Sequence, residues 1–493
     1  MRRNLEILQL VLLGGFVGVA LALGYWQFFR QDDLLSRATN PRVAEEARRV
    51  VRGRILDRDG RVLAENVSEP DGGSHRTYPT GLLAHLVGYH SERFGNFGIE
   101  DRFDDYLRGD RSADPFERLT SALLHRPTVG SDLVLTVDVR IQQAAVEALG
   151  SNPGAVVVLD PKTGAVLAMA SAPTFDPALV DARWQALVDD PGRPLVDRAI
   201  QSIYTPGSVF KAVTAAAALD LNLVDPRERF RCVDPIQIDG LTVDCRNHAH
   251  LPVVDFREAF AWSCNRTFAL TGLELGTPRL VLADGFKPPF PWQQDTSGSS
   301  RRLEEYAQRF WIGRSVPFAL PVEAGQLKGG TAWYPSLLAQ TAFGQGELEA
   351  TPMQMALVAA TIANGGSVPA PYVASEVRSP GGATTTLKSP GGNLGRAISA
   401  SAAGTLNEMM ILSVDTAYAH PAAIPGIRVG GKTGTAEAGE TGSTPHSWFI
   451  GYAPADDPRV AVAVILERKG SGTDFATPAA HTVIQRALDV YHR

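Results

Sequence analysis

The stretch YTPGSVFKAV pairs a hydroxyl with an amine at a spacing suited to nucleophilic chemistry. Ser208 and Lys211 lie three residues apart, so that on a helix they share one face. A serine hydroxyl is a poor nucleophile until a nearby base takes its proton, and a desolvated, neutral lysine amine is such a base. The alternative is a helix-capping serine beside a solvated lysine, because the S-x-x-K spacing alone is expected about once by chance in a chain of this length.

Lysine is rare in this chain, which makes each lysine informative. Seven of the 47 basic residues are lysines, and the remaining 40 are arginines. Arginine keeps its charge in proteins, whereas the pKa of a lysine falls on burial or beside another cation. A lysine in such a chain is therefore a candidate for proton transfer that arginine cannot perform.

The tripeptide Lys-Thr-Gly occurs twice, and the first copy has the composition of a turn. In residues 159–169 (LDPKTGAVLAM), it lies between two β-like runs. Pro161 presets φ early in the turn and Gly164 supplies a positive φ at its end. We expect Lys162 to lie in water at the tip of a hairpin.

The second copy begins a β-like run. Gly430 and Gly431 precede Lys432 in GGKTGTAEAG, and glycines there allow the close approach of another backbone or a ligand. A lysine cation and two threonine hydroxyls are suited to binding a carboxylate. The predicted substrate-binding residues are Thr433, Gly434 and Thr435.

A third polar element is the stretch WSCNRTF. Ser263 and Asn265 would lie on one edge of a turn and offer a hydroxyl and an amide. Taken alone, this S-x-N spacing is explained equally well by the polarity of an ordinary loop. The three elements S-x-x-K, S-x-N and K-T-G in this order, separated by 55 and 169 residues, are far more specific than any one of them.

Hydrophobic periodicity predicts the elements that must position these residues. Thr351 and the following proline predict a helix N-terminus. A hairpin of type I′ is expected around Asp59-Gly60 within residues 52–66. We expect helices at 139–150, 209–221, 351–366 and 478–493, strands at 132–138, 154–170, 426–438, 447–454 and 459–468, and flexible loops at 290–305 and 377–395.

The N-terminus predicts a membrane anchor. Residues 8–29 carry no charge and are long enough to span a bilayer as a helix. Arg2 and Arg3 precede the segment and predict a cytoplasmic N-terminus, while Tyr25 and Trp26 fit the outer interface. The alternative is a cleaved signal peptide, but the segment is long for one and YWQFFRQDD follows in place of a small-residue cleavage site. In either case the rest of the chain is expected outside the cytoplasm.

Charge and cysteine content add two expectations. A formal net charge of −6 on 493 residues argues against bulk nucleic-acid binding. Cys232 and Cys245 bracket a turn between two β-like runs, and in an oxidising compartment they are candidates for a disulfide. Two buried free thiols are the alternative. Cys264 is then left over.

The ordered combination of the three motifs resembles that of penicillin-binding proteins and class A β-lactamases. The likeness extends to blocks such as RGRILDRDGRVLAEN, GNFGIEDRFDDYLRGD, YTPGSVFK and AFGQGELEATPMQMALVAATIANGG, which touch nearly the whole chain after the anchor. The chain is similar to a class B penicillin-binding protein, a monofunctional peptidoglycan transpeptidase, of the compact penicillin-binding protein A type with a short pedestal.

The resemblance implies an α/β fold. It predicts a β-lactamase-like transpeptidase domain, in which an antiparallel sheet is flanked by helices and joined to an all-helical part. A small mixed α+β pedestal and one transmembrane helix would precede it. The implied boundaries are 1–30 for the cytoplasmic tip and anchor, 31–132 for a pedestal of the dimerisation type, and 133–493 for the transpeptidase domain.

The resemblance also implies a role for each motif residue. Ser208 would attack the penultimate D-Ala carbonyl of a stem peptide, with Lys211 as base. Ser263 would relay a proton to the leaving amine, Asn265 would hold the peptide and Lys211, and Lys432 would set the local potential and lower the pKa of Lys211.

The resemblance further implies how the substrate is held and resolved. Thr433 and Thr435 would receive the substrate carboxylate. The backbone N–H groups of Ser208 and Thr435 would form an oxyanion hole, which typically contributes about 3–4 kcal/mol per donor. A second stem peptide's amine would resolve the acyl-enzyme, and β-lactams would acylate Ser208 and stall there.

The resemblance also implies which cofactors and partners to expect, and two residues differ from the usual family pattern. No metal or organic cofactor is expected. A polytopic SEDS-type membrane glycosyltransferase is the expected partner, contacted by the anchor helix and by residues 52–66. Val209 stands where many relatives carry threonine, and Cys264 is an uncommon middle residue in the S-x-N motif.

Other functions share these motifs. A bifunctional class A enzyme would need a glycosyltransferase domain, for which the roughly one hundred residues before Asp132 are too few. A β-lactamase needs neither anchor nor pedestal. A D,D-carboxypeptidase would admit water at the second step, and a β-lactam-binding sensor or scaffold would not turn over; both remain alternatives to transpeptidation.

Overall fold

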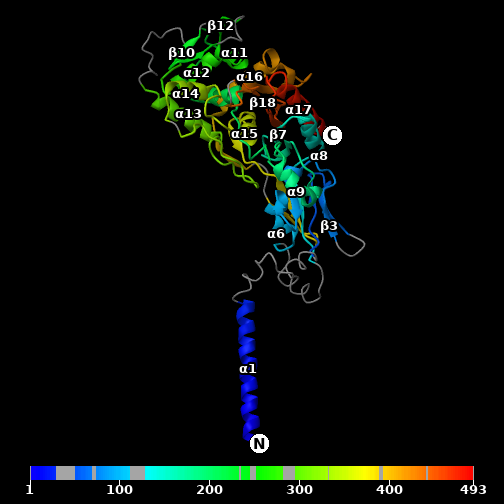
Figure 1. Cartoon of the computed structure of the whole chain (residues 1–493). Coiled ribbons are helices and arrows are strands. Elements are labelled where there is room, and N and C mark those ends of the chain that lie inside the picture. Colours follow the sequence, from blue (N-terminus) through cyan, green and yellow to red (C-terminus); the bar gives the residue numbers. More distant parts are fainter. Residues whose placement is uncertain are drawn as a thin grey trace.

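The computed structural model describes ten stretches of the chain. They are residues 2–28, 50–68, 74–111, 128–232, 235–244, 251–280, 295–330, 332–387, 392–439 and 442–491. Helix α1 (Arg2–Phe28) is the first element (Figure 1). Its window Gln9–Trp26 has a mean hydropathy of 1.7 and buries none of its side chains against the rest of the described chain. By length and composition this helix is able to cross a membrane.

A six-stranded sheet gathers strands from distant parts of the chain. Its order is β15-β14-β6-β1-β2-β3, with β1 and β6 parallel and the other pairs antiparallel. The strands are β1 (Ile55–Leu56), β2 (Val62–Ser68), β3 (Ser74–Thr77), β6 (Asp132–Leu135), β14 (Ala374–Arg378) and β15 (Thr384–Thr386). The sheet that begins in the pedestal is therefore completed by β14 and β15, which follow β6 by about 240 residues in the chain.

The predicted hairpin between β1 and β2 forms, but its turn is not of type I′. A type I′ turn needs positive φ at both central residues. Gly60 has φ of +85°, whereas Asp59 is not among the residues with positive φ. The Asp57 side chain accepts hydrogen bonds from the backbone N–H groups of Asp59 and Arg61 at 2.9 and 2.8 Å, and this local bonding favours the alternative turn.

A buried ion cluster holds the rest of the pedestal together. Glu100 is fully buried and accepts hydrogen bonds from Arg52 at 2.9 Å and from Arg76 at 2.6 Å. Burial raises the pKa of Glu100, but the two guanidinium groups outweigh it and leave the pKa below its ordinary value. The short elements around the cluster are α4 (Ala84–Val87), β4 (Tyr89–Ser91), β5 (Gly95–Phe97), α5 (Ile99–Arg102) and α6 (Asp104–Leu107).

A five-stranded antiparallel sheet forms the centre of the C-terminal part of the chain. Its order is β17-β18-β19-β7-β8, so β17 is an edge strand. The strands are β7 (Gly154–Leu159), β8 (Val166–Ala172), β17 (Gly430–Ala436), β18 (His446–Ala453) and β19 (Val460–Leu466). The predicted strands are confirmed, and so is the turn role of the first Lys-Thr-Gly: Lys162 is exposed at the β7–β8 turn and pairs with Asp457.

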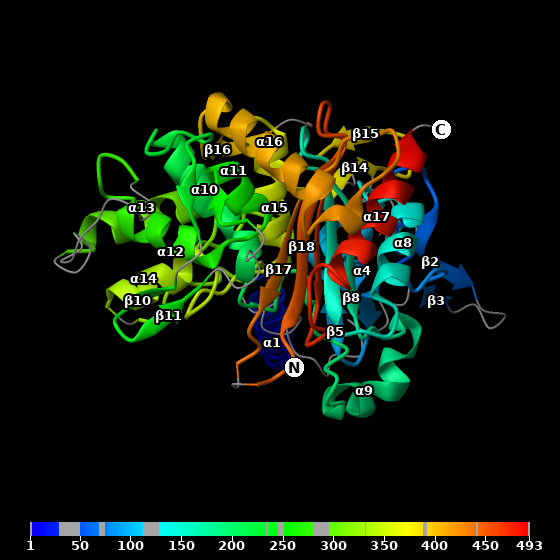
Figure 2. The ribbon, with the colours of Figure 1, turned by 90° about the horizontal axis from the view of Figure 1, so that it is seen from above.

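Helices cover both faces of this sheet (Figure 2). Helices α8 (Val139–Leu149) and α17 (Ala476–Tyr491) pack on one face, and α15 (Pro352–Ala363) packs on the other. Strand residues alternate between the two cores: Val156 and Val158 pack with α8 and α17, whereas Val157 packs on the α15 side. Thr351 caps α15 with a complete capping box, as its sequence predicts.

A helical part lies beside the edge strand β17. Its main helices are η2 (Gly207–Phe210), α10 (Lys211–Asp220), α11 (Phe256–Ala261), α12 (Asn265–Glu274), α13 (Ser297–Arg309), α14 (Pro335–Ala342) and α16 (Ala400–Thr416). The short strands of the chain outside the two large sheets and the pedestal are β9 (Phe230–Arg231), β10 (Ile236–Ile238), β11 (Leu241–Val243), β12 (Val253–Val254), β13 (Ser367–Pro369) and β16 (Asn393–Arg396). Elements η1 (Pro177–Leu179) and α9 (Val180–Asp189) pack on β4 of the pedestal, and η5 (His420–Ala422) packs on α16 and α17.

The prediction of a flexible loop is wrong for residues 297–305. They lie in α13, whose buried Leu303 and Tyr306 tie the helix to the core, and their polar composition reflects the solvent-facing side of that helix. In the second segment, residues 377–378, 384–386 and 393–395 lie in β14, β15 and β16, and turns and bends separate β14 from β15. Residues 290–294 and 388–391 lie outside the described residues.

The cysteines differ in part from expectation. The predicted hairpin forms as β10 and β11, with Asp239 and Gly240 at positive φ. Cys232 and Cys264 are both disulfide-linked in the structure, so the expectation that Cys264 is left over is wrong. The chain has three cysteines, and Cys245, which lies outside the described residues, could pair with only one of these two. The linkage of both therefore contradicts the predicted Cys232–Cys245 pair. The Thr267 hydroxyl lies 3.6 Å from the Cys232 sulfur and 3.2 Å from the Cys264 sulfur.

Candidate active site

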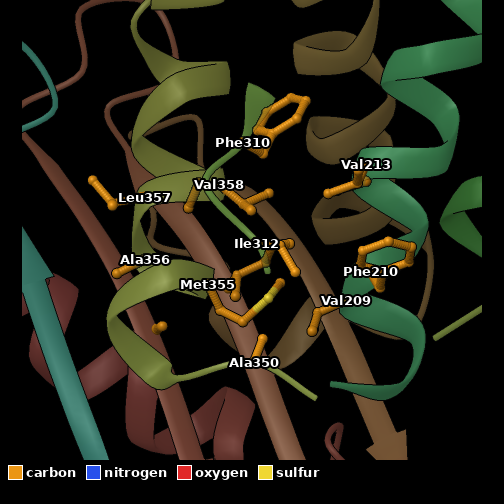
Figure 3. Close-up of a cluster of buried hydrophobic side chains, with 14 of the residues drawn as sticks. Val209, Phe210, Val213, Phe310, Ile312, Ala350, Met355, Ala356, Leu357 and Val358 are labelled. Carbon is orange, nitrogen blue, oxygen red and sulfur yellow. The ribbon is translucent and has the colours of Figure 1, made fainter. Parts of the chain in front are cut away.

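The turn that carries Ser208 is fixed by close backbone contacts. Gly207 has φ of +61°, and its N–H donates to the Gly344 carbonyl at 2.8 Å. Ser208 is half-buried in the 3₁₀ turn η2, which runs directly into α10. The next two side chains, Val209 and Phe210, are fully buried in the cluster drawn in Figure 3. Packing on one side and backbone hydrogen bonds on the other thus hold the hydroxyl in place.

Lys211 joins the first two motifs. Its side chain is fully buried. Its Nζ lies 3.0 Å from Ser208 Oγ, 3.1 Å from Ser263 Oγ, 2.7 Å from the Ser263 carbonyl oxygen and 2.7 Å from Asn265 Oδ1. The structure therefore brings S-x-x-K and S-x-N together around one amine.

The surroundings of Lys211 favour its neutral form. Burial, and after it the charge of Lys432, lower the pKa of Lys211 well below its ordinary value. A neutral amine has two N–H groups and one lone pair. The Ser263 carbonyl and Asn265 Oδ1 accept the two N–H groups, which leaves the lone pair for a serine hydroxyl.

Ser263 reaches Lys211 through an unusual backbone conformation. It lies between α11 and α12 with φ of +61°, a region that non-glycine residues rarely adopt. The Ser263 N–H donates to the Phe260 carbonyl at 3.0 Å, and Cys264 is the N-cap of α12. Such a conformation costs about 1–3 kcal/mol and persists where its surroundings over-determine it. Asn265 follows as the first residue of α12 and is exposed.

Lys432 is the second buried amine. It lies on β17, is fully buried, and its Nζ donates to the Thr433 carbonyl at 3.2 Å. Burial lowers the pKa of Lys432 to about 7. Its Nζ lies 5.7 Å from the centre of the Phe260 ring, and Lys211 Nζ lies at the same distance from the Phe268 ring. Aromatic faces thus replace part of the hydration that each amine loses.

The glycines of the second Lys-Thr-Gly motif do permit close packing. A β-carbon on Gly434 would lie 3.0 Å from the Pro206 carbonyl oxygen, from Trp448 Cβ and from Val209 Cγ1. One on Gly431 would lie 2.6 Å from the Phe449 ring. A side chain on Gly434 would therefore push β17 away from the Ser208 turn, and one on Gly431 would clash with the neighbouring strand β18.

The two threonines of this motif differ in exposure. Thr433 is buried, whereas Thr435 is exposed beside the Ser208 turn. The Gly472 N–H donates to Thr435 Oγ1 at 3.3 Å, so the hydroxyl proton of Thr435 remains free to bind an anion. Gln345 Nε2 donates to the Thr435 carbonyl at 3.3 Å.

Four contributors to the site were not predicted as such. The rings of Phe260 and Phe268 lie over the two amines, and Gln345 and Gly472 contact Thr435. The block AFGQGELEA contains Gln345 and was a recognisable signal. The others had none, because their roles depend on contacts between distant segments. Among the described residues, no group of three or more His, Cys, Asp or Glu side chains is arranged to hold a metal ion.

Comparisons with known proteins agree with this geometry. Residues 154–486 match the model for the penicillin binding protein transpeptidase domain, and residues 52–133 match that for the penicillin binding protein A dimerisation domain. The chain is 33% identical to the peptidoglycan D,D-transpeptidase PbpA of Mycolicibacterium smegmatis, covering 94% of both chains. It is 32% identical to the protein of the same name in Mycobacterium tuberculosis, covering 99% of both.

Solved structures give the same picture. A ceftriaxone acyl-enzyme complex of penicillin-binding protein A from M. tuberculosis is similar, with a TM-score of 0.79 and 32% identity, covering 90% of this chain and 99% of that one. The D,D-transpeptidase domain of a peptidoglycan glycosyltransferase from Eggerthella lenta has a TM-score of 0.77 and 35% identity, with the same coverage.

Proposed function

Because the chain belongs to the penicillin-binding protein transpeptidase family, we infer that it is a serine peptidoglycan D,D-transpeptidase that β-lactams acylate. The observation that carries this inference is the contact between the Lys211 amine and the Ser208 hydroxyl at 3.0 Å, with Lys211 buried and its pKa lowered. A buried neutral amine in this position is the base that a serine nucleophile needs.

In the acylation step, Lys211 takes the Ser208 proton as the oxygen attacks the penultimate D-Ala carbonyl. The C–N bond to the terminal D-Ala then breaks, and the leaving amine receives a proton. Ser263 is the group that relays this proton, since its Oγ lies 3.1 Å from Lys211 Nζ. Asn265 holds the amine and the donor peptide. A β-lactam undergoes the same attack, but its leaving nitrogen stays tethered to the acyl group.

The oxyanion is stabilised by backbone N–H groups of Ser208 and Thr435. The Thr435 carbonyl accepts a hydrogen bond from Gln345, so it points to the free edge of β17. In a strand, the N–H and C=O of one residue point to the same side, so the Thr435 N–H also faces this edge. A β-carbon on Gly207 would lie 2.8 Å from the Thr435 carbonyl oxygen. This closeness of the Ser208 turn to the free edge of β17 supports a shared oxyanion hole.

The substrate carboxylate is bound by Thr433 and Thr435, with Lys432 supplying positive potential. The exposed Thr435 hydroxyl has its oxygen held by the Gly472 N–H. Lys432 has a pKa of about 7, so its charge is present in part near neutral pH. This charge is also the second cause of the lowered pKa of Lys211.

The acceptor in the second step separates the proposed function from its alternatives. A stem-peptide amine as acceptor gives transpeptidation, and water gives D,D-carboxypeptidation. A protein whose acyl-enzyme reacts with no acceptor would be a β-lactam-binding sensor or scaffold. The complete set of Ser208, Lys211, Ser263, Asn265 and Lys432 around one point argues against a scaffold. This chain matches the relatives named D,D-transpeptidases over nearly their whole length, which favours a stem-peptide amine as the acceptor.

Helix α1 supports a proposal about location and partners. It is the membrane anchor, with the catalytic part outside the cytoplasm, and the domains divide at 1–30, 31–132 and 133–493. A SEDS-type membrane glycosyltransferase binds the anchor and the pedestal around residues 52–66. A pull-down in which pedestal variants retain the polymerase as well as the parent protein does would count against this partner.

The first experiment measures intact mass after incubation with benzylpenicillin, using the full chain in detergent beside Ser208→Ala. A stable adduct on the parent and none on the variant is expected. No adduct on the parent would contradict the proposal. A transient adduct with release of hydrolysed drug would favour carboxypeptidase chemistry. Cross-linking of a stem-peptide donor to an amine acceptor then tests the second step.

A further inference from the structure

A cavity lies where the pedestal meets the segment that leads to Ser208. Its volume is about 490 Å³, which is the size of a site for a small organic molecule. Four separate parts of the chain line it: His85 and residues 97–102 of the pedestal, residues 197–201, and residues 318–321. Hydrogen bonds tie these stretches together, from Arg102 Nε to the Ala319 carbonyl at 3.1 Å and between His85 Nε2 and the Pro194 carbonyl at 2.7 Å.

Asp197 lines this cavity with a half-satisfied carboxyl group. The residue is 1% exposed. Its Oδ1 accepts hydrogen bonds from Ser171 Oγ at 2.7 Å and from the Ala199 N–H at 3.0 Å. Its Oδ2 is buried and has no hydrogen-bond partner among the described residues. A buried carboxyl oxygen left in this state is unfavourable, so a group that pairs with it gains binding free energy.

Among the described residues, His85 is the group whose charge acts on the Asp197 carboxyl. Burial raises the pKa of Asp197, and the interaction with His85 lowers it by less. Burial also lowers the pKa of His85, which disfavours a positive charge on its imidazole. The Arg198 guanidinium is directed to Glu467 and to the Gly192 and Arg193 carbonyls instead. A positively charged ligand group would supply what the surrounding side chains do not.

The walls around Asp197 suit an apolar body. Ile200, Phe318, Leu320 and Pro321 contribute side chains to the lining, together with Phe97 of the pedestal. We propose that this cavity is a binding site for a small organic cation, with one ammonium group paired to Asp197 Oδ2 and an apolar body packed between the pedestal and residues 318–321. The site is distinct from the one that contains Ser208, and it does not depend on the transpeptidase reaction.

A ligand bound in this cavity would contact the segment that leads to the Ser208 turn. Residues 197–201 continue along the chain to Tyr204, whose backbone pairs with Ala350, and then to the Ser208 turn. The Ile200 carbonyl also accepts a hydrogen bond from the Glu323 N–H at 2.9 Å. A molecule held at Asp197 therefore contacts both the pedestal and the segment that carries the nucleophile.

The test uses the full chain in phosphatidylcholine nanodiscs, with empty nanodiscs as the blank. Binding of 2-(4-fluorophenyl)ethylamine is measured by ¹⁹F relaxation before and after reaction with benzylpenicillin. The reaction blocks the site at Ser208, so binding that remains afterwards is binding at the cavity. Its uncharged counterpart, 2-(4-fluorophenyl)ethanol, is titrated in parallel. We expect saturable binding of the amine that survives benzylpenicillin and is at least tenfold tighter than binding of the alcohol.

Two variants make the test specific. Asp197→Asn keeps the shape and the acceptor at Oδ1 but has no charge, and we expect it to bind the amine at least tenfold more weakly. Ala319→Trp fills the cavity from the opposite wall and should abolish binding with Asp197 intact. Asp189→Asn, on the exposed face of α9, is the matched control and should bind as the parent does. Absence of binding, equal binding by Asp197→Asn, or tighter binding of the alcohol would overturn the proposal.

Discussion

A β-carbon on Gly207 would lie 2.8 Å from the carbonyl oxygen of Thr435, so the turn that carries the nucleophile and the edge strand of the sheet meet at backbone contact distance. Gly207 also has φ of +61°. Both the contact and the conformation require glycine. The short distance between the Ser208 turn and β17 thus depends on the absence of a β-carbon at position 207.

Replacing Gly207 should separate these two elements. We expect Gly207→Ala to lower the rate of acylation by benzylpenicillin at least tenfold and the free energy of unfolding by about 1–3 kcal/mol. Gly404→Ala is the control, because a β-carbon there meets nothing within 4 Å in α16. It should leave acylation unchanged and add up to about 1 kcal/mol of stability. Parental acylation by Gly207→Ala would show that the close contact is not needed.

Lys211→Arg tests the base directly. Arginine keeps its charge and cannot accept the Ser208 proton. The expected loss in acylation rate is about 10²–10⁴-fold, measured by stopped-flow with a fluorescent penicillin. Lys328→Arg makes the same exchange at a half-exposed lysine 3.9 Å from Glu304 and should acylate normally. A Lys211→Arg rate within about tenfold of the parent would remove Lys211 from the role of base.

Lys432 should make stability depend on pH. Its pKa is about 7 in the folded protein because of burial, whereas an unfolded lysine titrates at about 10.4. Between these values the unfolded chain binds a proton that the folded protein lacks, so stability rises with pH. Relative to Lys432→Met, the parent should gain about 2 kcal/mol between pH 7 and pH 9, measured by denaturant unfolding. A constant difference between the two proteins across this range would contradict the burial effect.

Glu100 should be a large contributor to pedestal stability. Replacing it with glutamine leaves the buried Arg52 and Arg76 without their shared carboxylate, at an expected cost of about 3–5 kcal/mol in the free energy of unfolding. Glu376→Gln removes one carboxylate from the more exposed pair with Arg378 and should change stability by less than about 1 kcal/mol. Equal effects of the two substitutions would mean that burial of the ion cluster adds nothing.

The chemistry of the site was readable in the sequence, because motif residues act through their own functional groups. Ser208, Lys211, Ser263, Asn265 and Lys432 were all named from residue type and spacing. The two Lys-Thr-Gly copies were told apart by their neighbours, since proline and glycine report local backbone geometry. The helix at Thr351 and the central strands followed from caps and periodicity in the same way.

Tertiary structure decided everything that depends on distance and solvent exclusion. The lowered pKa of Lys211 arises from burial and from Lys432, which is 221 residues away in the chain. The positive φ of Ser263, the helix at 297–305 and the disulfide linkage of Cys264 also escaped prediction. Each reflects packing against segments remote in sequence, and such packing overrides local propensity. Residue type specified which groups react, and the fold specified how closely they meet and how little water surrounds them.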